Sequence, residues 1–204
     1  MTVKAPEQTR GRILQSAYEE FHRNGFQGAS INSIVTSAGI TKGALFHHFS
    51  GKNALGYAVV EEVLKPMVRK VWVEPMIQCE DPIQALKDLL SCFREDMKQN
   101  PTIVLNGCPV NNLAQEMSPL DEEFRTRLEA IYDEWRGAIA AAFARGIENG
   151  TVRPEVSPAA TAVFLVSAFE GIIGAIKSSR SITLAKHAVS GLFDYLDSLA
   201  PRAS

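Results

Sequence analysis

Apolar residues recur at helical spacing along almost the whole chain, and this pattern restricts the possible folds more than any other feature. Ile13, Leu14, Ala17 and Phe21, for example, fall at i, i+1, i+4 and i+8 and so share one face of a helix. Gly25 follows them as a C-terminal stop. The alternating runs and tight hairpin turns that would indicate strands are nearly absent. We therefore predict an all-α fold of about nine helices.

The predicted helices differ in length, and Gly, Pro and Asn mark most of their ends. We expect helices over residues 7–24, 31–38, 41–50, 52–74, 82–100, 109–117, 119–149, 158–178 and 182–199. Pro66 predicts a kink within the 52–74 helix. Because no long linker interrupts the chain, this helix joins two predicted domains, a small one over residues 1–52 and a larger one over residues 53–204.

Charge is divided unevenly between these two parts. The whole chain has a net charge of −2, but its first 52 residues hold six Lys or Arg against three acids, which leaves +3 there and −5 in the rest. A basic end joined to an acidic body indicates two tasks on one chain. Apolar residues make up 46% and charged residues 22%, which excludes a disordered tail protein, a collagen-like repeat and a disulfide-dense module.

The cysteines Cys79, Cys92 and Cys108 are odd in number and contain no Cys-x-x-Cys pair. The four histidines do not cluster with them in the sequence, so we expect no disulfide framework, no metal site and no cofactor. The first twelve residues lack the apolar core of a signal peptide. These features predict a protein of the reducing cytoplasm.

The run from Ala159 to Ile176 is apolar enough to require a membrane test. Its eighteen residues fall just short of the roughly 20 that span a bilayer, and Glu170 lies inside it. A charge near the centre of a span costs about 2.5–3.5 kcal/mol, and no second span accompanies this one. We therefore expect no membrane partner and interpret the run as a helix buried on most sides, as at a subunit interface.

Two unusually short helices, separated only by Ala38-Gly39-Ile40, give residues 26–52 the layout of a helix-turn-helix. Gly39 can adopt the left-handed conformation that such a turn needs. With the apolar residues facing inward, the outer surface of the second short helix consists of Thr41, Lys42, Gly43, Ala44, Phe46, His47 and His48. The small residues allow close approach to a duplex, and Lys42 supplies a phosphate or guanine contact.

Two further features of this segment bear on anion and metal binding. Lys52 stands at the start of the next helix, where backbone N–H groups can also hold a phosphate. His47 and His48 occupy adjacent helix positions, whose side chains diverge by about 100° and do not readily chelate one metal ion. We expect one of them to face solvent near a phosphate and the other to pack partly against the domain.

The stretch SINSIVTSAGITKGALFHHFSGK, from Ser30 to Lys52, resembles the DNA-binding signature of the TetR-type transcriptional repressors. The resemblance implies double-stranded operator DNA as a partner and adds Ser30 to the DNA-binding residues. It also implies an all-helical regulatory domain in the rest of the chain. The family commonly has Tyr, whose phenol can reach a phosphate, where this chain has Phe46. His47 and Lys52 would then carry more of the grip on the DNA backbone.

Members of this family are homodimers in which the last two long helices of each subunit form a four-helix bundle. The resemblance therefore places the dimer contact on residues 156–178 and 182–199, which supply small residues and more apolar surface than one subunit can cover. The predicted interface residues are Phe164, Ala168, Gly171, Ile172, Ala175, Val189, Leu192, Phe193 and Leu196. A two-fold dimer would place its recognition helices about 34–36 Å apart and require a roughly palindromic site.

The stretch NGCPVNNLAQEMSP, over residues 106–119, is similar to a Gly-Cys-x-x-x-Asn-Leu-x-x-Glu-x-Ser segment in one branch of the family. Some members of that branch sense electrophiles or oxidants through this cysteine, sometimes with a nearby lysine. The resemblance makes Cys108 a candidate thiol sensor and Lys177 its candidate partner. Cys108 lies just before a predicted helix, whose N-terminus would stabilise a thiolate. The alternative is that Cys108 is a packing residue in the wall of a ligand pocket.

A small-molecule inducer is expected in an apolar cavity of the larger domain, oriented by a few polar groups. The predicted lining is Met67, Val71, Trp72, Phe93, Met97, Leu105, Cys108, Asn111, Asn112, Gln115, Trp135 and Phe169. Each of these residues could equally be simple core. The resemblance implies that an inducer, or modification of Cys108, moves the 52–74 helix and shifts the population away from the DNA-binding arrangement.

No sequence motif of a nucleotide-binding, hydrolase or metalloprotease site occurs, and we do not expect an enzyme. The interpretation that explains both halves is a DNA-binding transcriptional regulator of the repressor type, released by a small ligand or by thiol modification. The alternative is a dimeric helical protein that binds small molecules and has no DNA activity. Phe46 is the one feature that favours this alternative.

Overall fold

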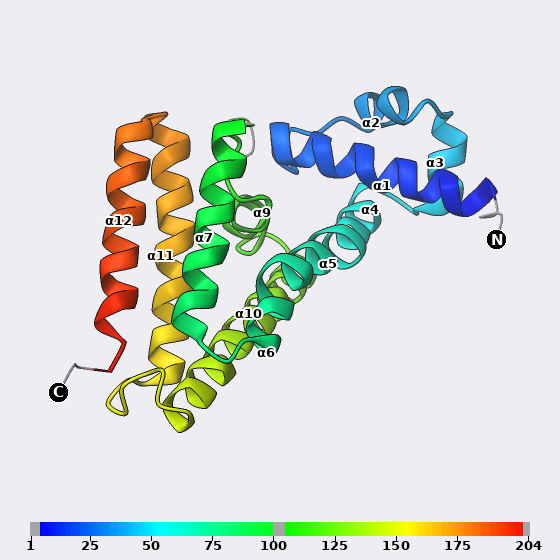
Figure 1. The fold of residues 1–204 in the computed structure, drawn as a ribbon. Helices are drawn as coiled ribbons and strands as arrows, with labels where there is room; N and C mark the ends of the chain where they lie inside the picture. Colours follow the sequence, from blue (N-terminus) through cyan, green and yellow to red (C-terminus); the bar gives the residue numbers. More distant parts are fainter. Residues whose placement is uncertain (1–4, 100–104, 202–204) are drawn as a thin grey trace. The chain divides into compact units, whose positions relative to one another are not determined.

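The computed structural model describes residues 5–99 and 105–201, and these residues form helices and connecting turns without strands. Figure 1 labels the helices α1 (Ala5–Asn24), α2 (Ile31–Ala38), α3 (Lys42–His48), α4 (Lys52–Val59), α5 (Lys65–Val68), α6 (Glu74–Gln78), α7 (Pro82–Gln99), α9 (Pro109–Met117), α10 (Glu122–Glu148), α11 (Pro158–Ser179) and α12 (Ile182–Ser198). If the run from α4 to α6 is counted once, the described residues form nine helices. The predicted all-α fold is confirmed for them.

The run from α4 to α6 is continuous, because two wider, π-helical segments, Val60–Leu64 and Arg69–Val73, join its three α-helical pieces. In each segment an N–H bonds to the carbonyl five residues earlier, from Lys65 to Val60 and from Glu74 to Arg69. A proline follows each segment within two residues. A wider turn accommodates the proline ring and its missing N–H. The helix therefore continues to residue 78, past the predicted end at residue 74.

Side-chain caps and a glycine turn delimit the two short helices of the helix-turn-helix. Ser30 caps α2, and its hydroxyl accepts a hydrogen bond from the N–H of Ser33 at 3.4 Å. Thr41 caps α3 in the same way, accepting from Ala44 at 3.2 Å. Gly39 ends α2 with φ +60°, which confirms the left-handed turn. These caps fix where both short helices begin and how the chain passes between them.

The long helix α10 begins three residues later than predicted, at Glu122. The reason is Asp121, whose carboxylate accepts the N–H groups of Glu123 at 3.0 Å and Phe124 at 3.1 Å. This places the N-cap at residue 121, after a turn through residues 118–120. The N–H of Phe124 and the Tyr57 hydroxyl, which donates to Asp121 at 2.8 Å, hold the Asp121 pKa below its ordinary value.

The chain divides into two compact units. The first comprises residues up to Met67 together with Pro109–Ala130, and the second comprises Val68–Cys108 and residues from Ile131 onward. In the first unit α1 packs on α2 and α4, around the fully buried side chains of Ile13, Ile34, Leu45, Leu55 and Phe124. The predicted domains 1–52 and 53–204 stay a prediction, because the two compact units are defined by contacts between residues and not by what the residues bind.

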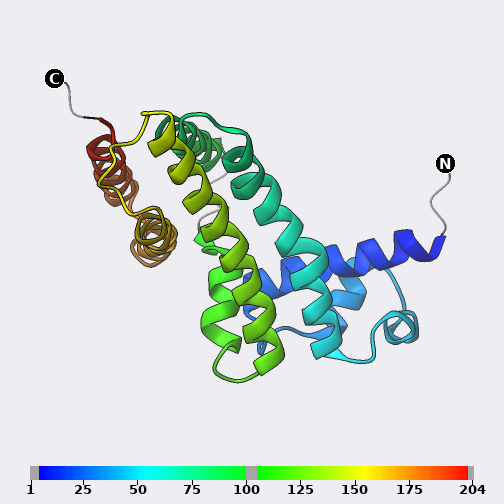
Figure 2. The same ribbon diagram turned by 90° about the horizontal axis from the view of Figure 1, so that it is seen from below.

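The second unit contains α7, α11, α12 and the later part of α10. Its last two helices lie side by side in both views (Figures 1 and 2) and form an antiparallel pair. Among the described residues, α11 is the one helix long and apolar enough to cross a membrane, by length and composition only. A core helix passes the same test, and α11 packs on α12 and buries a face that includes Phe169 and Glu170.

Candidate functional site

The outer surface of α3 presents most of the side chains predicted to contact DNA. Lys42, Gly43, Phe46 and His47 are exposed, and Phe46 is 45% exposed although it is large and apolar. His48 is half-buried, and its ring lies 5.5 Å from that of His47. One histidine thus faces solvent and the other is partly packed, as expected. Ala44 is also half-buried, while Thr41 is exposed and keeps a hydroxyl proton to donate beyond its cap.

Two arginine side chains of α1 contact the C-terminal ends of α2 and α3. The Arg12 guanidinium donates to the carbonyl of Ala38 and, at 3.2 Å, to that of Gly39. These two carbonyls end α2, so the cation satisfies groups that a helix C-terminus leaves open. Arg10 lies 4.5 Å over the ring of Phe49, the residue after α3, and pairs with Glu62. Arg10 and Arg12, two of the basic residues near the N-terminus, therefore stabilise the first unit.

Lys52 is also engaged within the first unit, which the sequence did not predict. Its ammonium donates to the carbonyls of Gln27 at 3.0 Å and Ala29 at 2.6 Å and lies 5.1 Å from the centroid of the Phe26 ring. From the opposite side, Glu116 of α9 accepts the N–H groups of Phe26 at 2.7 Å and Gln27 at 2.8 Å. We call residues 25–29, between α1 and α2, the clamped turn.

The residues predicted to line an inducer pocket fall in both units, some in the first and some in the second. Trp72, Phe93, Trp135 and Phe169 form an aromatic cluster in the second unit, with Phe169 at its centre. Ring centroids lie 4.5 Å apart for Trp72 and Phe169, 5.3 Å for Phe93 and Phe169, and 5.1 Å for the two tryptophans. A cavity of about 20 Å³ lies against Trp72, Trp135 and Phe169, which leaves room for about one water molecule.

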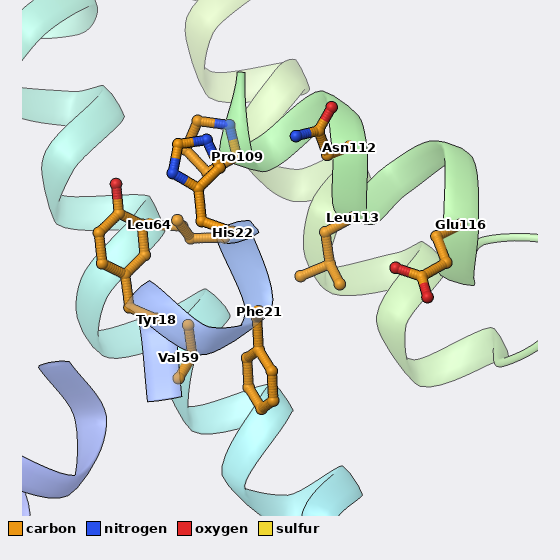
Figure 3. A pocket seen from close by; sticks show the side chains of 9 residues that line it. All are labelled: Tyr18, Phe21, His22, Val59, Leu64, Pro109, Asn112, Leu113 and Glu116. Atoms are coloured by element: carbon orange, nitrogen blue, oxygen red, sulfur yellow. The ribbon is translucent and has the colours of Figure 1, made fainter. Parts of the chain in front are cut away.

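Asn112 lines a different pocket, in the first unit, between α1, α9 and the run that follows α4 (Figure 3). Its walls are Tyr18, Phe21, His22, Val59, Leu64, Pro109, Asn112, Leu113 and Glu116. Met67, Asn111 and Gln115 also belong to the first unit, and neither cavity has them in its lining. Val71 and Leu105 are exposed, and the side chain of Met97 lies outside the described residues.

Glu170, a buried acid of the second unit, is a candidate functional residue that the sequence did not predict. It is only 7% exposed, and among the described residues neither carboxylate oxygen has a hydrogen-bond partner of normal geometry. Burial raises the pKa of Glu170 to about 7, and the thiol of Cys108 opposes that rise. The available signal in the sequence was a charged residue inside an apolar run.

Cys108 itself is half-buried and immediately precedes α9. Its thiol acts on the carboxylate of Glu170, which is an acid. Lys177 is exposed and lies seven residues beyond Glu170 on α11, which is about 10 Å along a helix axis. The roles of Cys108 and Lys177 in thiol sensing stay predictions.

The residues predicted for the dimer contact fall on two sides of the α11–α12 pair. Phe164 is 49% exposed, Gly171 is exposed, and Ala168, Ile172, Ala175 and Phe193 are half-buried. Val189, Leu192 and Leu196 are instead buried inside the second unit, and the last two line the cavity beside Trp72. We now assign these three to the core, because α12 turns that face toward its own chain. Among the described residues, no group of three or more His, Cys, Asp or Glu gathers as a metal site.

Two family models match the chain. The model described as "Bacterial regulatory proteins, tetR family" matches residues 13–59, and the one described as "Tetracyclin repressor-like, C-terminal domain" matches residues 82–192. The second match alone covers more than half of the chain. The first spans α2, α3 and the turn between them.

Curated relatives and solved structures agree with these matches. The HTH-type transcriptional repressor DhaR of Mycobacterium sp. (strain GP1) is 26% identical over 172 residues, 84% of each chain. An uncharacterised HTH-type transcriptional regulator of Lactococcus lactis subsp. lactis is 30% identical over 140 residues, 69% of this chain and 70% of its own. A TetR transcriptional regulator from Chloroflexus aurantiacus J-10-FL superposes with a TM-score of 0.85 at 26% identity, over 98% of this chain and 100% of the other.

Proposed function

The chain belongs to the TetR family of bacterial transcriptional regulators, and on this basis we propose that it represses transcription in the cytoplasm as an operator-bound homodimer. A small molecule, or modification of Cys108, would release it from DNA. The observation that carries the proposal is the exposed surface of α3, a capped helix whose basic, small and aromatic side chains project from a rigid three-helix scaffold.

The DNA contacts are proposed from that surface. Lys42 would bind a phosphate or a guanine edge, and Gly43 would let the helix approach the floor of the major groove. Phe46 cannot reach a phosphate with a hydroxyl, but its exposed ring can pack on the methyl group of thymine. Because the Lys52 ammonium is already bonded within the protein, a phosphate there would meet the backbone N–H groups at the start of α4.

A homodimer is supported by an apolar surface that one chain leaves uncovered. Val163 is 53% exposed and Phe164 is 49% exposed on α11. Gly171 and Gly174 continue the same face, and a Cβ atom built on either meets nothing within 4 Å. Large exposed apolar side chains beside small residues are typical of helix pairs that pack on a partner. A second copy of α11 and α12 would cover this face as a four-helix bundle.

The release step has two proposed forms. A ligand in the second unit would enlarge the cavity beside Trp72 and favour a state that binds the operator less well. A covalent change at Cys108 would act at the start of α9, whose other end carries Glu116 and therefore reaches the clamped turn. The first form is better supported, because an acid beside Cys108 does not favour a thiolate.

The test is selection of random duplex DNA on the purified protein. We expect enrichment of a palindrome with half-sites about one helical turn apart. Titration of the selected duplex at several salt concentrations should give a log–log slope of about −0.9 per phosphate contact. Failure to enrich any sequence, together with a salt-independent interaction, would instead support a helical small-molecule-binding protein without DNA activity.

A further inference from the structure

Glu170 is a buried acid without a charged partner among the described residues. Its side chain lies on the inner face of α11, only 7% exposed, and neither carboxylate oxygen has a hydrogen-bond partner of normal geometry among the described residues. Removing a carboxylate from water without a partner is strongly unfavourable. A glutamine or a leucine at this position would lose less free energy on burial than a carboxylate does. Packing alone therefore does not explain why this residue is an acid.

Three basic side chains of the second unit have partners other than Glu170. Arg69 donates to Glu134 at 2.7 Å, Lys87 pairs with Asp197, and Arg145 donates to the carbonyl of Met76 at 2.6 Å. Burial raises the pKa of Glu170 to about 7, and among the described residues the thiol of Cys108 is the polar group that opposes this rise. An approaching cation would therefore meet a carboxylate with no competing counterion among these residues.

Two neighbours of Glu170 along α11 line the cavity beside the aromatic cluster. Phe169, the preceding residue, lies 4.5 Å from Trp72 and 5.9 Å from Trp135 between ring centroids. Phe169 and Val166, one turn before Glu170, both line the cavity of about 20 Å³. Aromatic faces attract cations, and Trp faces do so most strongly. The Nε1 atom of Trp135 is also buried without a hydrogen-bond partner among the described residues, so the cluster contains a free donor.

We propose that this cluster binds an organic cation, a protonated amine with an apolar body. Its ammonium group would donate to Glu170, and its body would lie against Trp72, Trp135 and Phe169. Because the cavity has room for about one water molecule, the rings must separate to admit the ligand. Release from DNA on amine binding would rest on the proposed function, whereas amine binding itself can be measured without an operator.

Intrinsic fluorescence offers a direct readout, because the two tryptophans of the chain are both members of this cluster. We would titrate the full-length protein at about pH 8 with hexylamine and, separately, with 1-hexanol, which has the same apolar body without a charge. The expected result is a saturable fluorescence change with an affinity for hexylamine about tenfold or more above that for hexanol. Glu170→Gln should abolish the preference, and the control Glu155→Gln, at an exposed acid, should retain it.

The two ligands are compared on the unmodified protein, so the test does not depend on a variant folding. Equal affinity for amine and alcohol, or a preference that survives in Glu170→Gln, would overturn the proposal. Operator binding is measured in parallel by fluorescence anisotropy of the selected duplex. A protein that binds its operator without preferring amines refutes this inference alone. A protein that prefers amines without binding DNA supports the inference and refutes the proposed repressor.

Discussion

Glu116 and Lys52 hold opposite sides of the same residue, Gln27. The Glu116 carboxylate accepts the Gln27 N–H at 2.8 Å, and the Lys52 ammonium donates to the Gln27 carbonyl at 3.0 Å. The bonds come from α9 and α4, at sequence distances of 89 and 25 residues. The clamped turn leads directly into α2, so these two side chains set the position of the helix-turn-helix within the first unit.

Replacement of Glu116 by Ala should destabilise the first unit by about 1–3 kcal/mol, because the N–H groups of Phe26 and Gln27 lose their acceptor. Urea unfolding would measure the free energy, and amide hydrogen exchange at residues 26 and 27 should accelerate. The neighbouring change Gln115→Ala removes an exposed side chain of the same helix and should leave both quantities near wild type. Unchanged exchange in Glu116→Ala would show that the turn does not depend on this carboxylate.

Gly25 should resist substitution for two independent reasons. Its φ is +75°, and a Cβ there would lie 3.0 Å from a Glu116 oxygen. Gly25→Ala should therefore lower the free energy of unfolding by about 1–2 kcal/mol. Gly11→Ala is the matched control: its Cβ meets nothing within 4 Å inside α1, so this change should raise stability by up to about 1 kcal/mol. Thermal unfolding that ranks the two variants in the opposite order would contradict this account.

Two lysines of the DNA-binding region should behave differently in operator binding. Lys42 is exposed on α3, so Lys42→Ala should weaken binding and reduce the salt slope by about 0.9. Lys52 already donates to two carbonyls, so Lys52→Met should lower the free energy of unfolding and leave the slope unchanged. Lys70→Ala, at an exposed residue of the second unit, is the control for loss of one charge. A reduced slope in Lys52→Met would instead show that Lys52 contacts a phosphate, as the sequence predicted.

The sequence predicted the local structure of the helix-turn-helix because its signals are local. Ser30 and Thr41 cap helices within three residues of themselves, and Gly39 needs only its own backbone. The bonds of Glu116 and Lys52 could not be predicted, since they join elements whose spatial relation no local pattern encodes. For the same reason the apolar residues of α12 do not by themselves show which of them pack on their own chain. Leu192 and Leu196, which the resemblance placed at the dimer contact, are buried inside the second unit.

Stability should depend on pH through Glu170. Burial raises the pKa of Glu170 from its ordinary value of 4.5 to about 7 in the folded protein, and the thiol of Cys108 opposes this rise. Between about pH 4.5 and 7 the unfolded chain releases this proton while the folded protein keeps it, so stability falls as pH rises, by about 3 kcal/mol in total. Glu170→Gln should remove this decline and be the more stable protein at pH 8. Urea midpoints that fall equally in both proteins would contradict the assignment.

Gly174 tests the proposed dimer, because only a partner subunit should detect a side chain there. In the single chain a Cβ at Gly174 meets nothing within 4 Å, and the residue is exposed on α11 near Gly171. If α11 packs closely on its partner, Gly174→Leu should disrupt the contact and shift the sedimentation mass from twice 22.3 kDa toward 22.3 kDa. Gly137→Leu, at an equally open and exposed position of α10, should remain dimeric. A Gly174→Leu protein that stays dimeric at micromolar concentration would place the subunit contact elsewhere, and operator affinity would then not depend on this face.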